Sequence, residues 1–128
     1  MADTEKITIN MSPVDLGQID LLVSEGFYSN RTDFIRTAIR NQINFHADTV
    51  RETVKRRIMG LGVIEVTRKD LEEHLRLGET HDYSVVGALN VASDIPVDLA
   101  LKTMNSIQVF GTLKISDELR AALKDRIR

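Results

Sequence analysis

The sequence contains no cysteine and no tryptophan among its 128 residues. Without cysteine there can be no disulfide framework, no thiolate metal site and no cysteine nucleophile. Only two tyrosines and four phenylalanines are present, so the core must be built mainly from aliphatic side chains. No apolar run approaches the roughly 18 residues that a membrane-spanning helix needs, so we expect a protein that does not enter a membrane.

The sequence also lacks an excess of positive charge, because 17 lysines and arginines stand against 19 aspartates and glutamates. A chain with this balance does not bind nucleic acid as a bulk polycation, so any such contact must be local. Residues 1–10 show no basic segment followed by an apolar run. We therefore predict no signal peptide and a cytoplasmic location.

The distribution of glycine divides the chain near residue 60. No glycine occurs between Phe27 and Met59, whereas most of the glycines lie beyond that point. We predict a first domain over residues 1–58 and a second over residues 59–128. The expected fold class is α+β, in which the first domain contributes one strand and two helices and the second is a small α/β module.

The first domain opens with the strictly alternating segment KITINM. Its apolar face consists of Ile7, Ile9 and Met11, and its polar face of Lys6, Thr8 and Asn10. This alternation predicts a short strand, which is unstable alone because both of its edges are unpaired. No second strand pattern occurs before residue 60, so we expect the same strand of another copy as its partner. The two copies would pair antiparallel about a two-fold axis, with the apolar face in the dimer core.

A helix is predicted from Pro13 to about Ser24, because Ser12 is a typical cap and proline suits the first helical position. Gly26 is expected to end this segment as a C′ glycine. Ser29 is then expected to cap a second helix.

The second helix has no glycine or proline before Gly60, so it could continue as far as Ile58. The polar run up to His46 leaves a break at that point open.

The polar face of the predicted strand suits the reading of DNA bases. A two-stranded ribbon fits the major groove, where lysine donates to guanine, asparagine pairs with adenine and threonine contacts thymine. The same three residue types are also common on a solvated strand face, so the composition of Lys6, Thr8 and Asn10 taken alone favours an ordinary solvated face.

The order of strand, helix, glycine turn and second helix favours the DNA-binding interpretation. The segment from Glu5 to Ile43 resembles the ribbon-helix-helix family of bacterial DNA-binding proteins, the group of MetJ, Arc and the CopG-type regulators. The similarity rests on KITINM, on the apolar pattern of the first helix and above all on GFYSNRTDFIRTAI. It implies an obligate homodimer with the ribbon in the major groove of double-stranded DNA.

The resemblance also implies that the start of the second helix binds the DNA backbone. Free N–H groups and the positive end of the helix dipole form an anion site there. That turn consists of Ser29, Asn30, Arg31 and Thr32. Asp33 weakens the anion site, although a carboxylate in the first turn also favours the helix.

The second domain contains a weak repeat. Gly62-Val-Ile-Glu-Val-Thr, Gly87-Ala-Leu-Asn-Val-Ala and Gly111-Thr-Leu-Lys-Ile-Ser each predict the end of a strand. Each is followed by a helical pattern, with Thr67, then Ser93 or Asp94, and then Ser116 as the expected caps. A βαβ-type sheet whose strands end alike is favoured over a small solenoid of three stacked strand–helix units.

No catalytic site, metal site or cofactor is predicted. His46, His74 and His81 are widely spaced and have no cysteine beside them. Gly60-Leu-Gly62 lacks the lysine and hydroxyl residue of a phosphate loop. These patterns argue against both an enzyme and a metal-responsive regulator.

The leading hypothesis is a sequence-specific DNA-binding transcriptional repressor. Its second domain would join dimers, which leaves tetramers or larger assemblies open, or would bind an effector. One alternative is an antitoxin, disfavoured because toxin-wrapping tails are usually disordered. The other is a structural protein whose C-terminal repeats polymerise.

Overall fold

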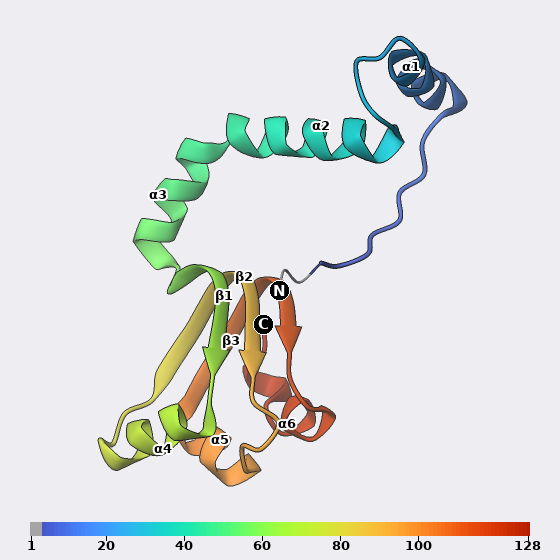
Figure 1. Cartoon of the computed structure of the whole chain (residues 1–128). Coiled ribbons are helices and arrows are strands. Elements are labelled where there is room, and N and C mark those ends of the chain that lie inside the picture. The colour runs from blue at the N-terminus through green and yellow to red at the C-terminus, as the bar shows by residue number, and fades with distance from the viewer. Residues whose placement is uncertain (1–3) are drawn as a thin grey trace. The chain divides into compact units, whose positions relative to one another are not determined.

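The computed structural model describes residues 4–128, which form six α-helices and a three-stranded parallel sheet (Figure 1). The chain divides into two compact units. The first ends at Asp48 and the second covers Thr49–Arg128. No helix within residues 4–128 combines the length and apolar character needed to cross a membrane.

Helix α1 covers Pro13–Ser24, as the sequence predicts. The Ser12 side chain accepts a hydrogen bond of 3.2 Å from the backbone N–H of Asp15, and Pro13 occupies the first position. Gly26 has a φ of 86°, a left-handed conformation that glycine adopts without strain. The glycine therefore ends the helical segment and redirects the chain toward α2.

Helix α2 covers Arg31–Phe45, and its cap is Asn30. The prediction that Ser29 is the cap is wrong, because the Asn30 side chain accepts from the N–H of Asp33 at 2.8 Å. Ser29 lies one residue further out, and its N–H donates to the Asp33 carboxylate at 2.9 Å. The helix stops at Phe45, and α3 follows over Ala47–Arg57. A continuous helix to Ile58 is thus not formed, and the break falls at His46.

Residues 4–12 form no regular secondary structure within the chain. The strand predicted over Lys6–Met11 is therefore not part of any sheet of a single copy. The physical reason is that a strand needs a neighbour, and within residues 4–48 no other strand is present. The predicted antiparallel ribbon would need a second copy of the chain.

The second unit alternates strands and helices. Its strands are β1 (Gly60–Val66), β2 (His81–Val91) and β3 (Met104–Lys114), which pair in parallel in chain order. Its helices are α4 (Arg68–Arg76), α5 (Val97–Thr103) and α6 (Asp117–Ala122), followed by a short 3₁₀ turn over Lys124–Arg126. Consecutive strand–helix units therefore stack in the order in which they occur along the chain.

Two of the three predicted helix caps in this unit are confirmed. Thr67 caps α4 through a reciprocal capping box with Asp70, and Ser116 caps α6. The prediction of Ser93 or Asp94 for α5 is wrong, because the helix begins one residue after Pro96. Proline has its φ fixed near the value that leads into a helix, so it starts α5 without a side-chain hydrogen bond.

The three repeat glycines lie side by side in one row across the sheet. Gly62 is in register with Gly87, and Gly87 with Gly111. All three have φ values between 128° and 131°, which an L-residue rarely adopts. The ribbons of β2 and β3 bend sharply along their length (Figure 1). The repeat in the sequence thus marks the line along which the sheet bends.

The core of the second unit lies on the inner face of the sheet. Its largest fully buried apolar side chains are aliphatic: Leu71, Leu89, Met104, Ile107, Leu119 and Leu123. They come from β2 and β3 and from helices α4 and α6, with Met104 as the first residue of β3 and Leu123 directly after α6. Alternation along the strands places Val86 and Phe110 on the opposite, outer face.

Candidate nucleic-acid interface

The N-terminal segment of residues 4–12 exposes both of its faces. Ile7 is 74% exposed and Ile9 is 60% exposed, and Met11 is also exposed. The polar residues Lys6, Thr8 and Asn10 are exposed as well. Burying an isoleucine side chain contributes roughly 1.5–3 kcal/mol. The single copy therefore leaves uncovered the very side chains that would stabilise a ribbon.

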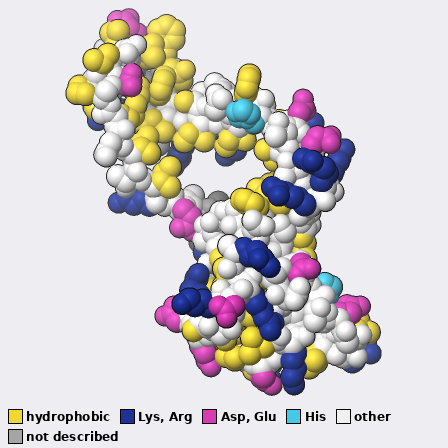
Figure 2. Space-filling model, turned by 180° about the vertical axis from the view of Figure 1, so that it is seen from behind, with side chains coloured by type: hydrophobic (Ala, Val, Ile, Leu, Met, Phe, Trp, Pro, Cys, Tyr) yellow, Lys and Arg dark blue, Asp and Glu magenta, His cyan; other side chains and the backbone are white. Residues whose placement is uncertain are grey.

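The helices of the first unit are also incompletely covered. Ile19 is the buried side chain of α1, whereas α2 has no buried residue, and its Ile39 and Ile43 are exposed. Figure 2 shows hydrophobic side chains on the surface of α1 and along α2. An apolar surface of this kind on a small helical unit indicates a protein interface.

The turn before α2 presents backbone N–H groups to the outside. The N–H of Asp33 is bound by the Asn30 side chain and that of Ser29 by the Asp33 carboxylate. The N–H groups of Arg31 and Thr32 belong to the first turn, where no intrahelical acceptor exists. Two of the backbone donors of this turn are thus taken by side chains and two can face an anion.

Arg31 is held by a residue that the sequence pattern did not single out. Its Nε and Nη2 donate to the two carboxylate oxygens of Asp20, at 2.7 Å and 2.8 Å. This pair lowers the pKa of Asp20. It joins the start of α2 to α1, and it balances the charge that was expected to face a phosphate. The two residues lie eleven positions apart in different helices, so no local spacing rule could have found the pair.

The described residues place the predicted site in two parts of one unit. Lys6, Thr8 and Asn10, which the sequence predicts to contact bases, lie on the segment before α1. The residues predicted to contact phosphates lie in the turn at the start of α2: Ser29, Asn30, Arg31 and Thr32. Tyr28 and Phe34 brace this turn by an edge-to-face ring contact of 5.0 Å.

Comparison with protein families decides what kind of protein this is. The model of the Ribbon-Helix-Helix transcriptional regulator family matches residues 2–120. The chain belongs to this family. Membership implies DNA-binding transcriptional regulation, and the family is typically non-enzymatic. Comparison with curated proteins and with solved structures gave no match.

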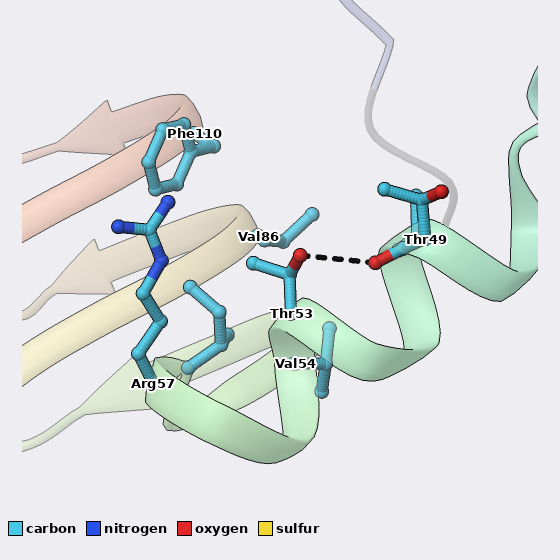
Figure 3. A pocket seen from close by; sticks show the side chains of 8 residues that line it. Thr49, Thr53, Val54, Arg57, Val86 and Phe110 are labelled. Atoms are coloured by element: carbon cyan, nitrogen blue, oxygen red, sulfur yellow. Dashed lines mark hydrogen bonds between the residues drawn. The ribbon is translucent and has the colours of Figure 1, made fainter.

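The second unit of this ribbon-helix-helix regulator carries an apolar groove between α3 and the outer face of the sheet. The groove has a volume of about 270 Å³. It is lined by Thr49, Val50, Thr53, Val54, Arg57, Ile58, Val86 and Phe110 (Figure 3). The Thr53 hydroxyl donates to the carbonyl of Thr49, so its polar atom is satisfied within the helix. Among residues 4–128, Arg57 is the only charged side chain that lines the groove.

The fold also brings together two histidines that are separate in the sequence. The rings of His74, on α4, and His81, on β2, lie 4.1 Å apart. His81 Nε2 is 3.3 Å from a carboxylate oxygen of Glu79. Within the part of the chain that the structure describes, there is no group of three or more histidine, aspartate or glutamate side chains suited to a metal ion.

Proposed function

We propose that this regulator is a sequence-specific transcriptional repressor that binds DNA as a homodimer. The Lys6–Met11 segments of two copies would form an antiparallel ribbon that enters the major groove. The observation that supports this most directly is that the segment is extended, is exposed on both faces and has no strand partner within residues 4–128 of its own chain. We assign DNA binding and dimerisation to residues 1–58 and assembly or effector binding to residues 59–128.

The dimer core follows from the apolar face of the ribbon. Ile7, Ile9 and Met11 would pack over the exposed apolar surface of the helices of both copies. Because each isoleucine contributes roughly 1.5–3 kcal/mol when fully buried, the four isoleucines of a dimer favour the ordered ribbon by roughly 6–12 kcal/mol. The same pairing satisfies the backbone donors and acceptors that the single segment leaves open.

The outer face of that ribbon would read the base sequence. Lys6 donates to guanine O6 or N7, Asn10 pairs in bidentate fashion with adenine, and Thr8 contacts a thymine methyl group or an acceptor. Each bidentate pair contributes about 1–3 kcal/mol of discrimination against the wrong base. Sequence specificity would then depend on very few side chains, all of them on one face.

The turn at the start of α2 would position the dimer on the DNA backbone. The N–H groups of Arg31 and Thr32 and the hydroxyls of Ser29 and Thr32 can donate to a phosphate. Asn30 contributes mainly by capping the helix and so holding these donors in place. Arg31 must share its guanidinium between Asp20 and the phosphate.

A selection of bound fragments from a random DNA pool, followed by affinity measurements on the selected and scrambled sites, tests the reading of bases. We expect Thr8→Ala and Asn10→Ala each to reduce the ratio of specific to non-specific affinity by about tenfold or more, because 1.4 kcal/mol of base discrimination corresponds to tenfold. Asn41→Ala, which changes an exposed residue of α2, is the matched control and should leave the ratio unchanged. If both ribbon variants select the parent sites with the parent affinity, the ribbon does not read the sequence.

A further inference from the structure

The sheet of the second unit has one open edge at β1 and one partly open edge at β3. Strand β1 lies at one edge and pairs with β2 alone, and β3 lies at the other. Unprotected edges of this kind are usually blunted by lysine, by proline or by very short strands. Strand β1 has seven residues and contains neither lysine nor proline. Its edge is therefore open to pairing with another strand.

The side chains of β1 are exposed where their counterparts in the middle strand are covered. Val63 is 60% exposed, whereas Ala88, its partner in β2, is only 9% exposed. Leu61 is exposed too, whereas Val86 in the same row is partly buried. The first strand thus has the surface of an interior strand from which one neighbour is missing.

Strand β3 has eleven residues, four more than β1, and only the later part of its outer edge is free. Ile127 pairs with Ile107 and the N–H of Arg128 donates to the Ile107 carbonyl, so the chain's own end covers the first half of this edge. The second half borders a depression of about 350 Å³. It is lined by Val109, Gly111, Thr112, Leu113, Arg120, Ile127 and Arg128.

The register of the rows shows that the two edges are complementary in extent. Gly62 of β1 and Gly111 of β3 lie in the same glycine row. Ile107 lies four residues before Gly111. The position four residues before Gly62 is Ile58, which lies before the start of β1. The part of β3 that its own C-terminus covers is therefore the part for which β1 has no counterpart.

Charge favours the same pairing. Glu65, Asn90 and Lys114 form one row on the outer face, and Asn90 donates to Glu65 at 3.2 Å. The row begins with a negative residue at the β1 edge and ends with a positive one at the β3 edge. Stacking β3 of one copy against β1 of the next in the same register places Lys114 beside Glu65, and opposite charges on neighbouring strands attract each other.

We propose that a second copy of this chain occupies the open edge, with β3 of one copy pairing in parallel with β1 of the next and Gly111 beside Gly62. The rows of the sheet then continue from copy to copy. Because the two surfaces differ, the contact is head-to-tail and joins ribbon dimers into larger assemblies. Arg120 donates to the carbonyl of Leu113, which precedes Lys114, so a second positive side chain lies near this end of β3. The contact involves only the second unit and does not depend on the proposed function in DNA binding.

Sedimentation velocity of the full chain between about 1 and 200 µM tests the proposal. We expect the parent protein to form species larger than its basic oligomer as the concentration rises. Glu65→Lys and Lys114→Glu each replace an attractive pair by a repulsive one. The lost attraction and the new repulsion cost about 0.2–1 kcal/mol each, so each variant should weaken this association by roughly 2- to 30-fold. Glu52→Lys makes the same change in charge on α3 and should have no effect.

Mixing the two variants decides between this contact and any other. In an equimolar mixture, a copy of the Glu65→Lys protein and a copy of the Lys114→Glu protein meet with opposite charges at positions 65 and 114. The double variant, which carries both substitutions, also has opposite charges at each contact. Both should therefore recover the parent association. Recovery in the mixture supports the head-to-tail contact. The proposal is overturned if the parent shows a single concentration-independent species, if either variant associates as well as the parent, or if the mixture is no better than its components.

Discussion

The row of repeat glycines allows the cost of backbone strain to be separated from the cost of a steric clash. A Cβ atom added at Gly87 would lie 2.1 Å from the carbonyl oxygen of Gly62, and one at Gly111 would lie 2.0 Å from the oxygen of Gly87. A Cβ at Gly62 meets nothing within 4 Å, because no strand precedes β1 within residues 4–59 of its own chain. The φ values of the three glycines are nearly the same.

Alanine at each of the three positions should therefore give two different results. Gly62→Ala introduces only the unfavourable φ, at about 1–3 kcal/mol. Gly87→Ala adds a clash with a backbone carbonyl that cannot rotate away, for which overpacking suggests a further cost of about 1–3 kcal/mol. We expect Gly87→Ala and Gly111→Ala to lower the free energy of unfolding by about 2–6 kcal/mol, a large part of the roughly 5–15 kcal/mol typical of a domain.

Urea denaturation followed by circular dichroism measures these differences, and hydrogen exchange of the β2 amides reports the second unit specifically. The measurement belongs at about 1 µM, where the proposed head-to-tail contact is weakest, because in that assembly the Cβ of Gly62→Ala would meet the Gly111 carbonyl of the neighbouring copy. Equal losses for all three variants would show that φ alone governs the row. A loss below about 0.5 kcal/mol for Gly87→Ala would refute the clash.

Three further outcomes are expected. Arg31→Ala should weaken binding to all DNA sequences about equally and reduce the steepness of log affinity against log salt by about one. Asp20→Asn frees the Arg31 guanidinium and should strengthen binding. Affinity titrations at several salt concentrations check both variants. Hydrogen bonds from Ser106 and Asn105 lower the pKa of Asp82, so its contribution to stability is present above its ordinary pKa and is lost as the pH falls through the lowered value. Urea midpoints at pH 7 and pH 3 should therefore differ less in Asp82→Asn than in the parent. Burial raises the pKa of Tyr83 to about 12, so the protein should lose stability between about pH 10 and pH 12, and Tyr83→Phe should reduce that loss.

The local features of the chain could be predicted from the sequence because they depend on neighbouring residues. Ser12 and Pro13 fix the start of α1, and Gly26 ends the segment with a left-handed φ. The three glycine-led repeats predict the strands and helices of the second unit. The resemblance to the ribbon-helix-helix family, carried by short strings of residues, is confirmed by the family match. The cap of α2 differs from the prediction because Asn30, next to Ser29, is also a good cap residue.

Other features arise only when distant segments come together in space, and no spacing rule in the sequence reports them. Arg31 and Asp20 pair across two helices, and the rings of His74, on a helix, and His81, on a strand, lie close together. The sequence predicts that glycines recur, but only the parallel register aligns them in one row, in which each carbonyl oxygen occupies the space that the next Cβ would need. Likewise, Glu65 and Lys114 are ordinary surface charges in the sequence. The order of strands places one at each open edge of the sheet, because parallel stacking turns sequence order into spatial order.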